Sequence, residues 1–304
     1  MTEKISPGIG NLSELNFTSA PSRVVSLVPS VTESLFDLGV GQSLVGITDY
    51  CVHPAALVAG LPKVGGTKNP NLQLIKAALP DLIIANQEEN RKEDIEALQA
   101  EGFKVWVTFP CTVREAIDVL WGIVRLFRVP QMGQRLSVLE TSYEWSNGAA
   151  ANMPPIKVFC PIWREPAASE GSLHWWMTIN HETYVHDLLR VCGAENIFAD
   201  RDRLYPLDAD LGEAPVMVEA GPKRDTRYPR VTMAEVVERA PDVILLPSEP
   251  YPFTEADLAA FESFPEIPAV QNQRLLLVEG SLLTWHGTRL ALALAELPAL
   301  LTLG

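Results

Sequence analysis

The sequence predicts an α/β protein with two similar lobes, each built on a parallel sheet. Three observations lead to this fold class. Short β-branched runs alternate with helical patterns along the chain, which is the signature of βα units. One helix–strand unit occurs twice, about half a chain apart. A stretch with helical periodicity separates the two halves and is long enough to run between lobes.

The first half contains four strand-like runs with helical patterns between them. The segments "SVTESLFDLG" and "RKEDIEALQAEG" each have a polar start and a glycine at the end, which are typical helix boundaries. Another helix begins at Thr112 and is ended by Pro130, because proline cannot continue a helix. The strand-like runs are Arg23 to Pro29, Leu44 to Thr48, Asp81 to Asn86 and Lys104 to Phe109.

The second half repeats these elements after the segment "QMGQRLSVLETSYEWSNGAAAN", which is helical for about 20 residues, or roughly 30 Å. The repeated unit is "NLQLIKAALPDLIIAN" (Asn71 to Asn86) and "TMAEVVERAPDVILLP" (Thr232 to Pro247), each a helix, then Pro-Asp, then a buried strand. The other elements expected here are strands at Ile156 to Trp163 and Arg274 to Gly280, and helices at about Glu182 to Cys192 and Thr254 to Phe261.

These elements divide the chain into four predicted segments. Residues 1–22 form an N-terminal extension, 23–128 a first α/β lobe, 129–153 an interlobe helix and 154–304 a second α/β lobe. Residues near 201–230 are rich in charge, proline and glycine, which predicts a surface insertion. Residues 165–175 are expected to form a loop extension.

Composition excludes several classes of function. The formal net charge is -14, which argues against a nucleic-acid or anionic-membrane surface because either needs a basic face. Glu3 and Glu14 stand where a secretory leader needs an apolar run, so we expect a cytoplasmic location for the chain as given, and a periplasmic or cell-surface one if a leader was removed. The four cysteines form no Cys-x-x-Cys pair, which argues against a zinc knuckle or a disulfide framework.

An ordered set of segments carries a family resemblance. It includes "RVVSLVPSVTESLFDLG", "LVGITDYCVHP", "LPKVGGTKNPNLQLI", "CGAENIF", "RYPRVTMAEV" and "VEGSLLTWHGTRL". Together, over about Arg23 to Leu303, they resemble the cobalamin and iron-siderophore substrate-binding proteins of ABC importers, in the helical-backbone metal-receptor branch and closest to its cobalamin-binding members. The resemblance implies two Rossmann-like lobes joined by one long backbone helix. It also implies a monomer that holds a metal chelate in the cleft between the lobes.

Four candidate ligand-binding residues lie in the first lobe. Tyr50 follows the second strand, where open parallel sheets place their ligands, and the family has an aromatic residue there; the alternative is a packed loop aromatic. Thr67 stands where the cobalamin binders have an aromatic. Asn86 and Glu88 follow the strand "DLIIAN", and the alternative for these polar residues is a helix N-cap.

Five further candidates come from the second lobe. Trp163 offers a stacking surface and Arg164 a bidentate donor, unless the arginine forms a surface salt bridge. Trp285 and His286 lie in the loop that the family extends over the ligand, and His286 is a weak candidate for an axial ligand to cobalt or iron. His181 is a weak pocket candidate, and its near-motif "HETYVH" is no zinc site, because His181 and the second histidine would be roughly 140° apart on a helix. Asn180 or Thr178 is expected to cap that helix.

The ligand class follows from the charges of these loops. They offer Arg164 and little else that is basic, which favours a neutral or cationic chelate such as a corrinoid over an anionic ferric siderophore. The alternatives are a ferric-siderophore or heme binder and, less favoured, a metal-dependent enzyme. No intrinsic cofactor is expected. Gly-x-Ser-x-Gly, phosphate-loop and dinucleotide motifs are absent from the sequence, which argues against catalysis.

Coupling to a permease is the last open question. In the family, one glutamate on each lobe docks onto permease arginines, seven residues before the repeated Pro-Asp. Gln73 and Ala234 occupy these positions here, and Glu235 is one residue away. Either the chain docks on a permease through shifted contacts, or it is a cytosolic family member that is no longer coupled to a transporter.

Overall fold

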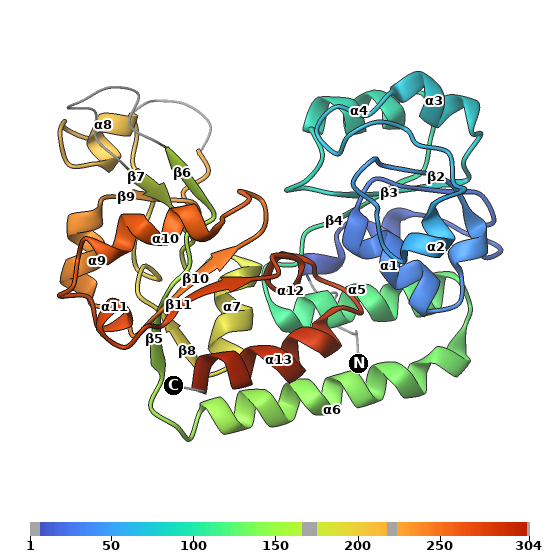
Figure 1. Cartoon of the computed structure of the whole chain (residues 1–304). Coiled ribbons are helices and arrows are strands. Elements are labelled where there is room, and N and C mark those ends of the chain that lie inside the picture. Colours follow the sequence, from blue (N-terminus) through green and yellow to red (C-terminus); the bar gives the residue numbers. More distant parts are fainter. Residues whose placement is uncertain (1–6, 166–174, 218–223, 303–304) are drawn as a thin grey trace. The chain divides into compact units, whose positions relative to one another are not determined.

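The chain divides into two compact units in the computed structural model (Figure 1), which describes residues 7–165, 175–217 and 224–302. Unit 1 contains residues 1–142 and 285–291, and unit 2 contains residues 143–284 and 292–304. Residues 285–291, which the sequence analysis placed in the second lobe, therefore cluster with unit 1. The remainder of the expected loop extension at 165–175, together with residues 1–6 and 218–223, lies outside the described residues.

Unit 1 is built on a four-stranded parallel sheet with the strand order β2-β1-β3-β4. Its strands are β1 (Val24–Ser26), β2 (Leu44–Ile47), β3 (Leu82–Asn86) and β4 (Val105–Thr108). The strand order reverses between β1 and β3, and open parallel sheets bind ligands beside such a switch point, at the carboxyl ends of the strands. The α-helices between residues 29 and 126 of this unit are α1 (Pro29–Asp37), α2 (Ala55–Val58), α3 (Leu72–Ala77), α4 (Lys92–Ala100) and α5 (Val113–Leu126).

Both faces of this sheet are covered, which explains why its strands are continuous apolar runs. Val25, Ile83 and Val105 share one core cluster with residues of α3 and α4. Trp106 points to the opposite face, because neighbouring residues of a strand alternate between faces. There a Cβ added at Gly122 of α5 would lie only 3.2 Å from the Trp106 ring. Single-turn 3-10 helices occur at Pro7–Ile9, Leu12–Glu14, Gly41–Ser43 and Pro130–Met132.

Unit 2 contains a second parallel sheet, with the order β11-β10-β5-β8. Its strands are β5 (Ile156–Phe159), β8 (Ala194–Asn196), β10 (Val243–Pro247) and β11 (Leu275–Val278). The helices are α7 (Tyr184–Val191), α8 (Leu207–Asp210), α9 (Met233–Arg239), α10 (Glu255–Glu262), α11 (Pro268–Gln271) and α12 (Ser281–Thr284). The two parallel sheets confirm the predicted fold class.

The repeated sequence unit forms the same structure in both units. Asn71–Asn86 folds as α3 followed by β3, and Thr232–Pro247 folds as α9 followed by β10. Each helix begins at a capping side chain: Asn71 accepts the backbone N–H groups of residues 73 and 74, and Thr232 forms a capping box with Glu235. These caps satisfy backbone donors that a helix start leaves unpaired.

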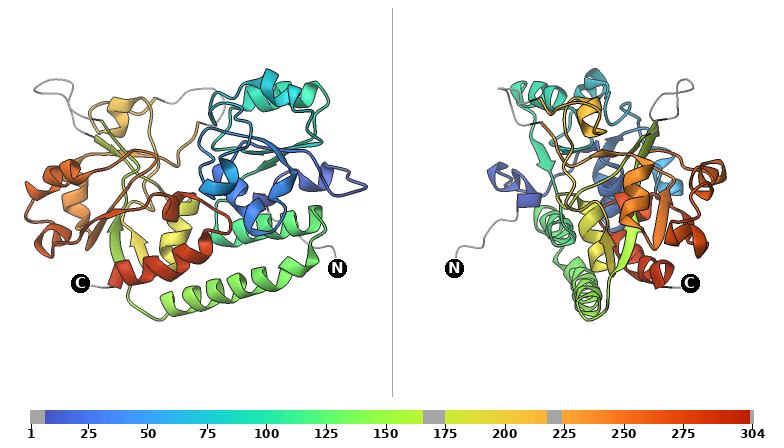
Figure 2. Two further views of the ribbon diagram at one scale, coloured as in Figure 1. Left: turned by 45° about the vertical axis from the view of Figure 1, so that its right-hand side comes forward. Right: turned by 90° about the vertical axis from the view of Figure 1, so that its left-hand side faces the viewer.

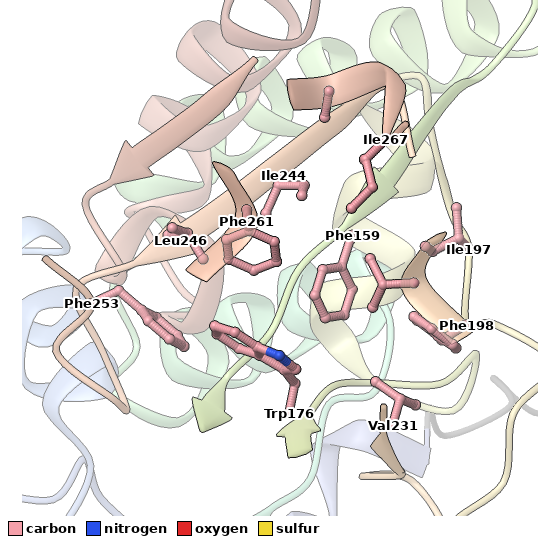
Figure 3. Packing of buried hydrophobic residues seen from close by; sticks show 12 residues of the cluster. Phe159, Trp176, Ile197, Phe198, Val231, Ile244, Leu246, Phe253, Phe261 and Ile267 are labelled. Carbon is pink, nitrogen blue, oxygen red and sulfur yellow. The ribbon is translucent and has the colours of Figure 1, made fainter. Parts of the chain in front are cut away.

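A small antiparallel sheet in unit 2 was not predicted from the sequence. It consists of β6 (Trp163–Glu165), β7 (Trp175–Met177) and β9 (Arg230–Val231), in the order β6-β7-β9. Its inner face joins the main core of the unit (Figure 3). There the centroid of the Trp176 ring lies 4.7 Å from that of Phe261 and 6.4 Å from that of Phe159. The small sheet is thus part of the packed structure of unit 2.

Two further helices contain residues of both units. The predicted interlobe helix is α6 (Gly133–Ala150), a continuous helix (Figures 1 and 2) in which only Leu136 and Leu139 are buried. The last helix, α13 (Leu290–Thr302), follows the segment that returns to unit 1. Within the described residues, no helix is both long enough and apolar enough to cross a membrane.

Candidate functional site

Polar side chains meet at the carboxyl edge of the unit 1 sheet. Asn86 ends β3, and its Nδ2 lies 3.4 Å from Thr108 Oγ1 at the end of β4 and 3.3 Å from His286 Nε2. The Asn86 Oδ1 accepts the backbone N–H of Glu88 at 2.8 Å, which fixes the orientation of the amide group. The Asn86 side chain is buried. It therefore shapes the loop that follows β3, a role close to the helix-start alternative considered from the sequence.

His286 is held neutral by its surroundings. Burial lowers its pKa to about 4, because a buried imidazole loses the hydration that stabilises its charged form. Since the Asn86 Nδ2 is a donor, it donates to His286 Nε2, which must then act as an acceptor. That lone pair is the one that an axial metal ligand at Nε2 would need. The contact favours a hydrogen-bonding role for His286.

The loops around this edge are tied to one another. Asn90, which the sequence analysis did not single out, accepts the backbone N–H of Asn86 at 2.8 Å and donates to Thr67 O at 3.0 Å. Lys68 Nζ donates to the backbone oxygen of Glu88. Thr67 and Glu88 therefore lie on neighbouring loops of unit 1, and both are joined to the loop of Asn86.

Two aromatic residues lie on other loops of unit 1. Tyr50 follows β2, is 63% exposed and lies near Gly66, where an added Cβ would be 3.5 Å from its ring. Trp285 packs edge-on against His53 with ring centroids 5.6 Å apart. The Arg289 guanidinium covers the Trp285 ring at 4.9 Å. An exposed tyrosine at the carboxyl edge of the sheet is available to stack on a flat ligand.

The small sheet of unit 2 separates Trp163 from Arg164. Trp163 does not extend β5 but begins β6, so successive residues point to opposite faces. Trp163 is 43% exposed and packs edge-on against Tyr251 at 5.3 Å. Arg164 points to the inner face, where it covers the Trp176 ring at 5.4 Å and its Nη1 donates to Asp257 Oδ1 at 2.7 Å. These two candidates therefore do not share one binding surface.

Tyr251 is an aromatic residue that the sequence analysis missed. It follows the carboxyl end of β10, as Tyr50 follows that of β2. Its ring contacts both Trp163 and Phe253, with centroids 5.3 Å and 4.6 Å away. The signal was present in "DVILLPSEPYPF", because an aromatic shortly after a buried parallel strand is expected at the ligand-binding edge.

His181 lies at the start of α7 but outside the helix. Its Nδ1 is 2.9 Å from Ala199 O. The predicted cap at Asn180 or Thr178 is wrong: Thr183 accepts the N–H of His186 and is the N-cap, while Asn180 accepts that of Glu182 in the preceding turn. Burial lowers the pKa of His186. In the part of the chain that the structure describes, no group of three His, Cys, Asp or Glu residues could hold a metal ion.

A hollow of about 450 Å³ lies at the other edge of the unit 1 sheet. Asp81 and Lys104, which line it, immediately precede β3 and β4. Phe17 and Phe103 supply the aromatic part of its wall. None of the candidate residues lines this hollow.

Comparison with known proteins now decides the family. The sequence profile of the family described as periplasmic binding protein matches residues 24–280, from the first residue of β1 to just beyond β11. The chain belongs to the periplasmic binding protein family. Tyr50, Trp163 and the other candidates up to His181 lie inside this match, whereas Trp285 and His286 lie beyond it.

Curated relatives of this periplasmic binding protein include vitamin B12-binding proteins. That of Vibrio cholerae serotype O1 is 28% identical over 192 residues, which cover 60% of this chain and 63% of the relative. That of Photorhabdus laumondii is 25% identical over 228 residues, covering 75% of this chain and 71% of the relative. The chain thus spans less than two thirds of the length of the first of these relatives.

Solved structures share the fold over almost the whole chain. The periplasmic vitamin B12 binding protein of Vibrio cholerae superimposes with a TM-score of 0.69 and 23% identity, covering 92% of this chain and 96% of that one. The periplasmic heme-binding protein RhuT from Roseiflexus sp. RS-1 gives a TM-score of 0.71 and 19% identity, covering 93% and 98%. At these identities, the likeness shows the two-lobe fold of this periplasmic binding protein.

Proposed function

We propose that this periplasmic binding protein binds a metal-chelating macrocycle without chemical conversion, and that the preferred ligand is a corrinoid such as cobalamin. One observation carries the proposal: exposed aromatic side chains follow the carboxyl ends of the parallel strands in both units. Exposed Tyr50 does so in unit 1, and exposed Trp163, packed against the half-buried Tyr251, does so in unit 2. Flat, amphipathic rings suit a large macrocycle with polar edges.

The relatives support the choice of ligand. The curated relatives reported above are named vitamin B12-binding proteins, and part of each aligns with this chain. A heme-binding protein shares the fold, so heme is the principal alternative, with ferric siderophores next. In this proposal, the metal arrives inside its chelator, and the protein contributes stacking surfaces and hydrogen bonds.

Coupling to an ABC permease is proposed in a form that does not use the expected glutamates. Gln73 and Ala234 are exposed in the first turns of α3 and α9, so both positions face solvent without a charge. The nearby Glu235 is not a substitute, because its carboxylate accepts hydrogen bonds from Thr232 and pairs with Arg201 at 3.3 Å. The proposal has two forms. Either the chain docks on a permease through other residues, or it is a family member that is not coupled to a permease.

The proposal is tested by titrating the full chain with cobalamin, hemin and a ferric siderophore while recording tryptophan fluorescence. We expect saturable quenching by cobalamin, and a loss of affinity of about tenfold in Trp163→Leu, because a stacked aromatic anchor is removed. Trp145→Leu is the matched control, since Trp145 is 79% exposed on α6 and follows no strand. Saturation by hemin but not by cobalamin would make heme the preferred ligand. Saturation by the siderophore alone, or by none of the three, would refute macrocycle binding.

A further inference from the structure

Three guanidinium groups surround one tyrosine ring in unit 2. Tyr205 lies between β8 and α8, and its hydroxyl donates to Asp225 O at 2.8 Å. The guanidinium carbons of Arg203, Arg224 and Arg230 lie 4.9, 4.7 and 5.8 Å from the centre of this ring. We call Tyr205 and these three arginines the arginine cluster. It occupies the predicted surface insertion near 201–230, whose sequence gave no indication of a shared site.

The acidic residues of this segment already have other partners. Asp210 accepts from Arg230 Nε at 2.8 Å and pairs with Arg201 at 3.1 Å. Burial would raise the pKa of Asp225, but hydrogen bonds from Arg227 and the nearby charge of Arg203 lower it. Asp225 is therefore ionised near neutral pH. The carboxylates of Asp210 and Asp225 are engaged mainly by Arg201, Arg227 and Arg230, and no carboxylate of the described residues pairs directly with Arg203.

Arg203 is the member of the cluster that lacks an acceptor. Its Nε is shielded from solvent and has no hydrogen-bond partner among the residues that the structure describes. Stacking over Tyr205 holds the guanidinium in place. A buried donor without an acceptor is costly, and a guanidinium presents a planar fork that fits a carboxylate or phosphate. The Arg203 guanidinium therefore has a donor geometry that suits an oxyanion.

The cluster adjoins the face of the small sheet that carries Trp163. In the strand register, Trp163 pairs with Met177, and Met177 pairs with Arg230. Residues directly opposite in an antiparallel sheet point to the same face, so these three residues form one row. Two strand spacings put the backbone of Arg230 roughly 10 Å from that of Trp163. A ligand stacked on Trp163 and Tyr251 therefore lies within reach of the cluster.

We propose that Arg203, held by Tyr205, binds an oxyanion substituent of the macrocycle. The substituent is a phosphodiester, as in cobalamin, or a carboxylate, as in heme. This inference deepens the proposed function and rests on it for the identity of the macrocycle. It also changes the charge argument from the sequence, where Arg164 was the principal basic candidate, because Arg203 is a further basic group near the face that carries Trp163.

The oxyanion site is tested first without any macrocycle. Inorganic phosphate is titrated into the full chain carrying ¹⁵N-labelled arginine, with sodium chloride at equal ionic strength as the reference. We expect the Arg203 Nε–H signal, identified by its loss in Arg203→Lys, to shift saturably. The exposed Arg91, which pairs with Glu93 and Asp94 at 3.8 Å in unit 1, provides the internal control. An Arg203 signal that phosphate does not shift, or shifts no more than that of Arg91, would overturn the inference.

A second experiment compares the affinities of the protein for cobalamin, hemin and cobinamide, in order to identify which ligand supplies the oxyanion. Cobinamide has the corrin ring without the phosphodiester. We expect Arg203→Met to weaken cobalamin or hemin by about tenfold or more and to leave cobinamide within twofold. Arg91→Met removes the same charge and serves as the control. Equal weakening of cobalamin and cobinamide would refute the oxyanion assignment. Failure of the wild-type chain to bind any macrocycle would refute the proposed function but not the phosphate result.

Discussion

The buried imidazole of His286 makes unit 1 sensitive to mild acid. Its pKa is about 4 in the folded chain, compared with about 6.5 for an exposed histidine. The unfolded chain therefore takes up the proton first as the pH falls, and protonation favours unfolding. Stability from this group is present above about pH 6.5 and is lost progressively down to the folded pKa. The two pKa values correspond to a loss of about 2 kcal/mol between pH 7 and pH 5, from about 1.4 kcal/mol per pKa unit.

The assay is urea denaturation of the wild-type chain and of His286→Gln at several pH values from 7 to 5. Glutamine keeps an oxygen that can accept from Asn86 but does not titrate, so the variant should lose about 2 kcal/mol less than the wild type over this range. His181→Gln is the matched control, because it makes the same substitution at an exposed histidine. Equal pH dependence in the wild type and His286→Gln, or a folded pKa of His286 near 6.5 by NMR, would refute the reasoning.

Two further predictions concern unit 2. Arg164→Met should lower the free energy of unfolding by about 1–3 kcal/mol, because it breaks an ion pair in which the side chains of Arg164 and Asp257 are only 21% and 10% exposed. A urea denaturation curve checks this; unchanged stability together with a tenfold loss of ligand affinity would instead assign Arg164 to ligand binding. Cys160 and Cys192 should resist alkylation in the folded chain at pH 8, since burial raises the pKa of each thiol to about 12 and the thiolate is the reactive form. Mass spectrometry locates the alkylated residues, and rapid alkylation of either cysteine would contradict its burial.

The parallel sheets could be predicted because their signal is local. Most of the strands are short apolar runs, and helices such as α3, α5 and α9 begin at the polar residues Asn71, Thr112 and Thr232. The repeated Pro-Asp unit added a second, independent signal at half-chain distance. The small antiparallel sheet was not predicted because its strands have only two or three residues, too few to show an alternation of apolar and polar residues. Its pairing also joins segments far apart in the sequence.

The placement of the candidate residues on loops could be predicted better than the contacts of their side chains, and their role in ligand binding stays a prediction. Tyr50 and Trp163 are exposed beyond strand ends, as expected from the position of ligands in parallel sheets. Arg164 was grouped with Trp163 because the two are adjacent in sequence, yet a strand turns adjacent residues to opposite faces. The contact of Asn86 with His286 joins residues 200 positions apart, and nothing in the local sequence indicates it.

The segment 285–291 has a consequence for the order of folding. It completes unit 1 after all but the last part of unit 2 has been made, since unit 1 otherwise ends at residue 142. This late segment supplies His286 against Asn86 and Arg289 against Glu33, with Arg289 Nη2 2.6 Å from the carboxylate. During synthesis, the first sheet can form early, but its carboxyl edge acquires these partners only after residues 285–291 have been made. A nascent chain that stops before residue 285 therefore lacks the contacts of His286 with Asn86 and of Arg289 with Glu33.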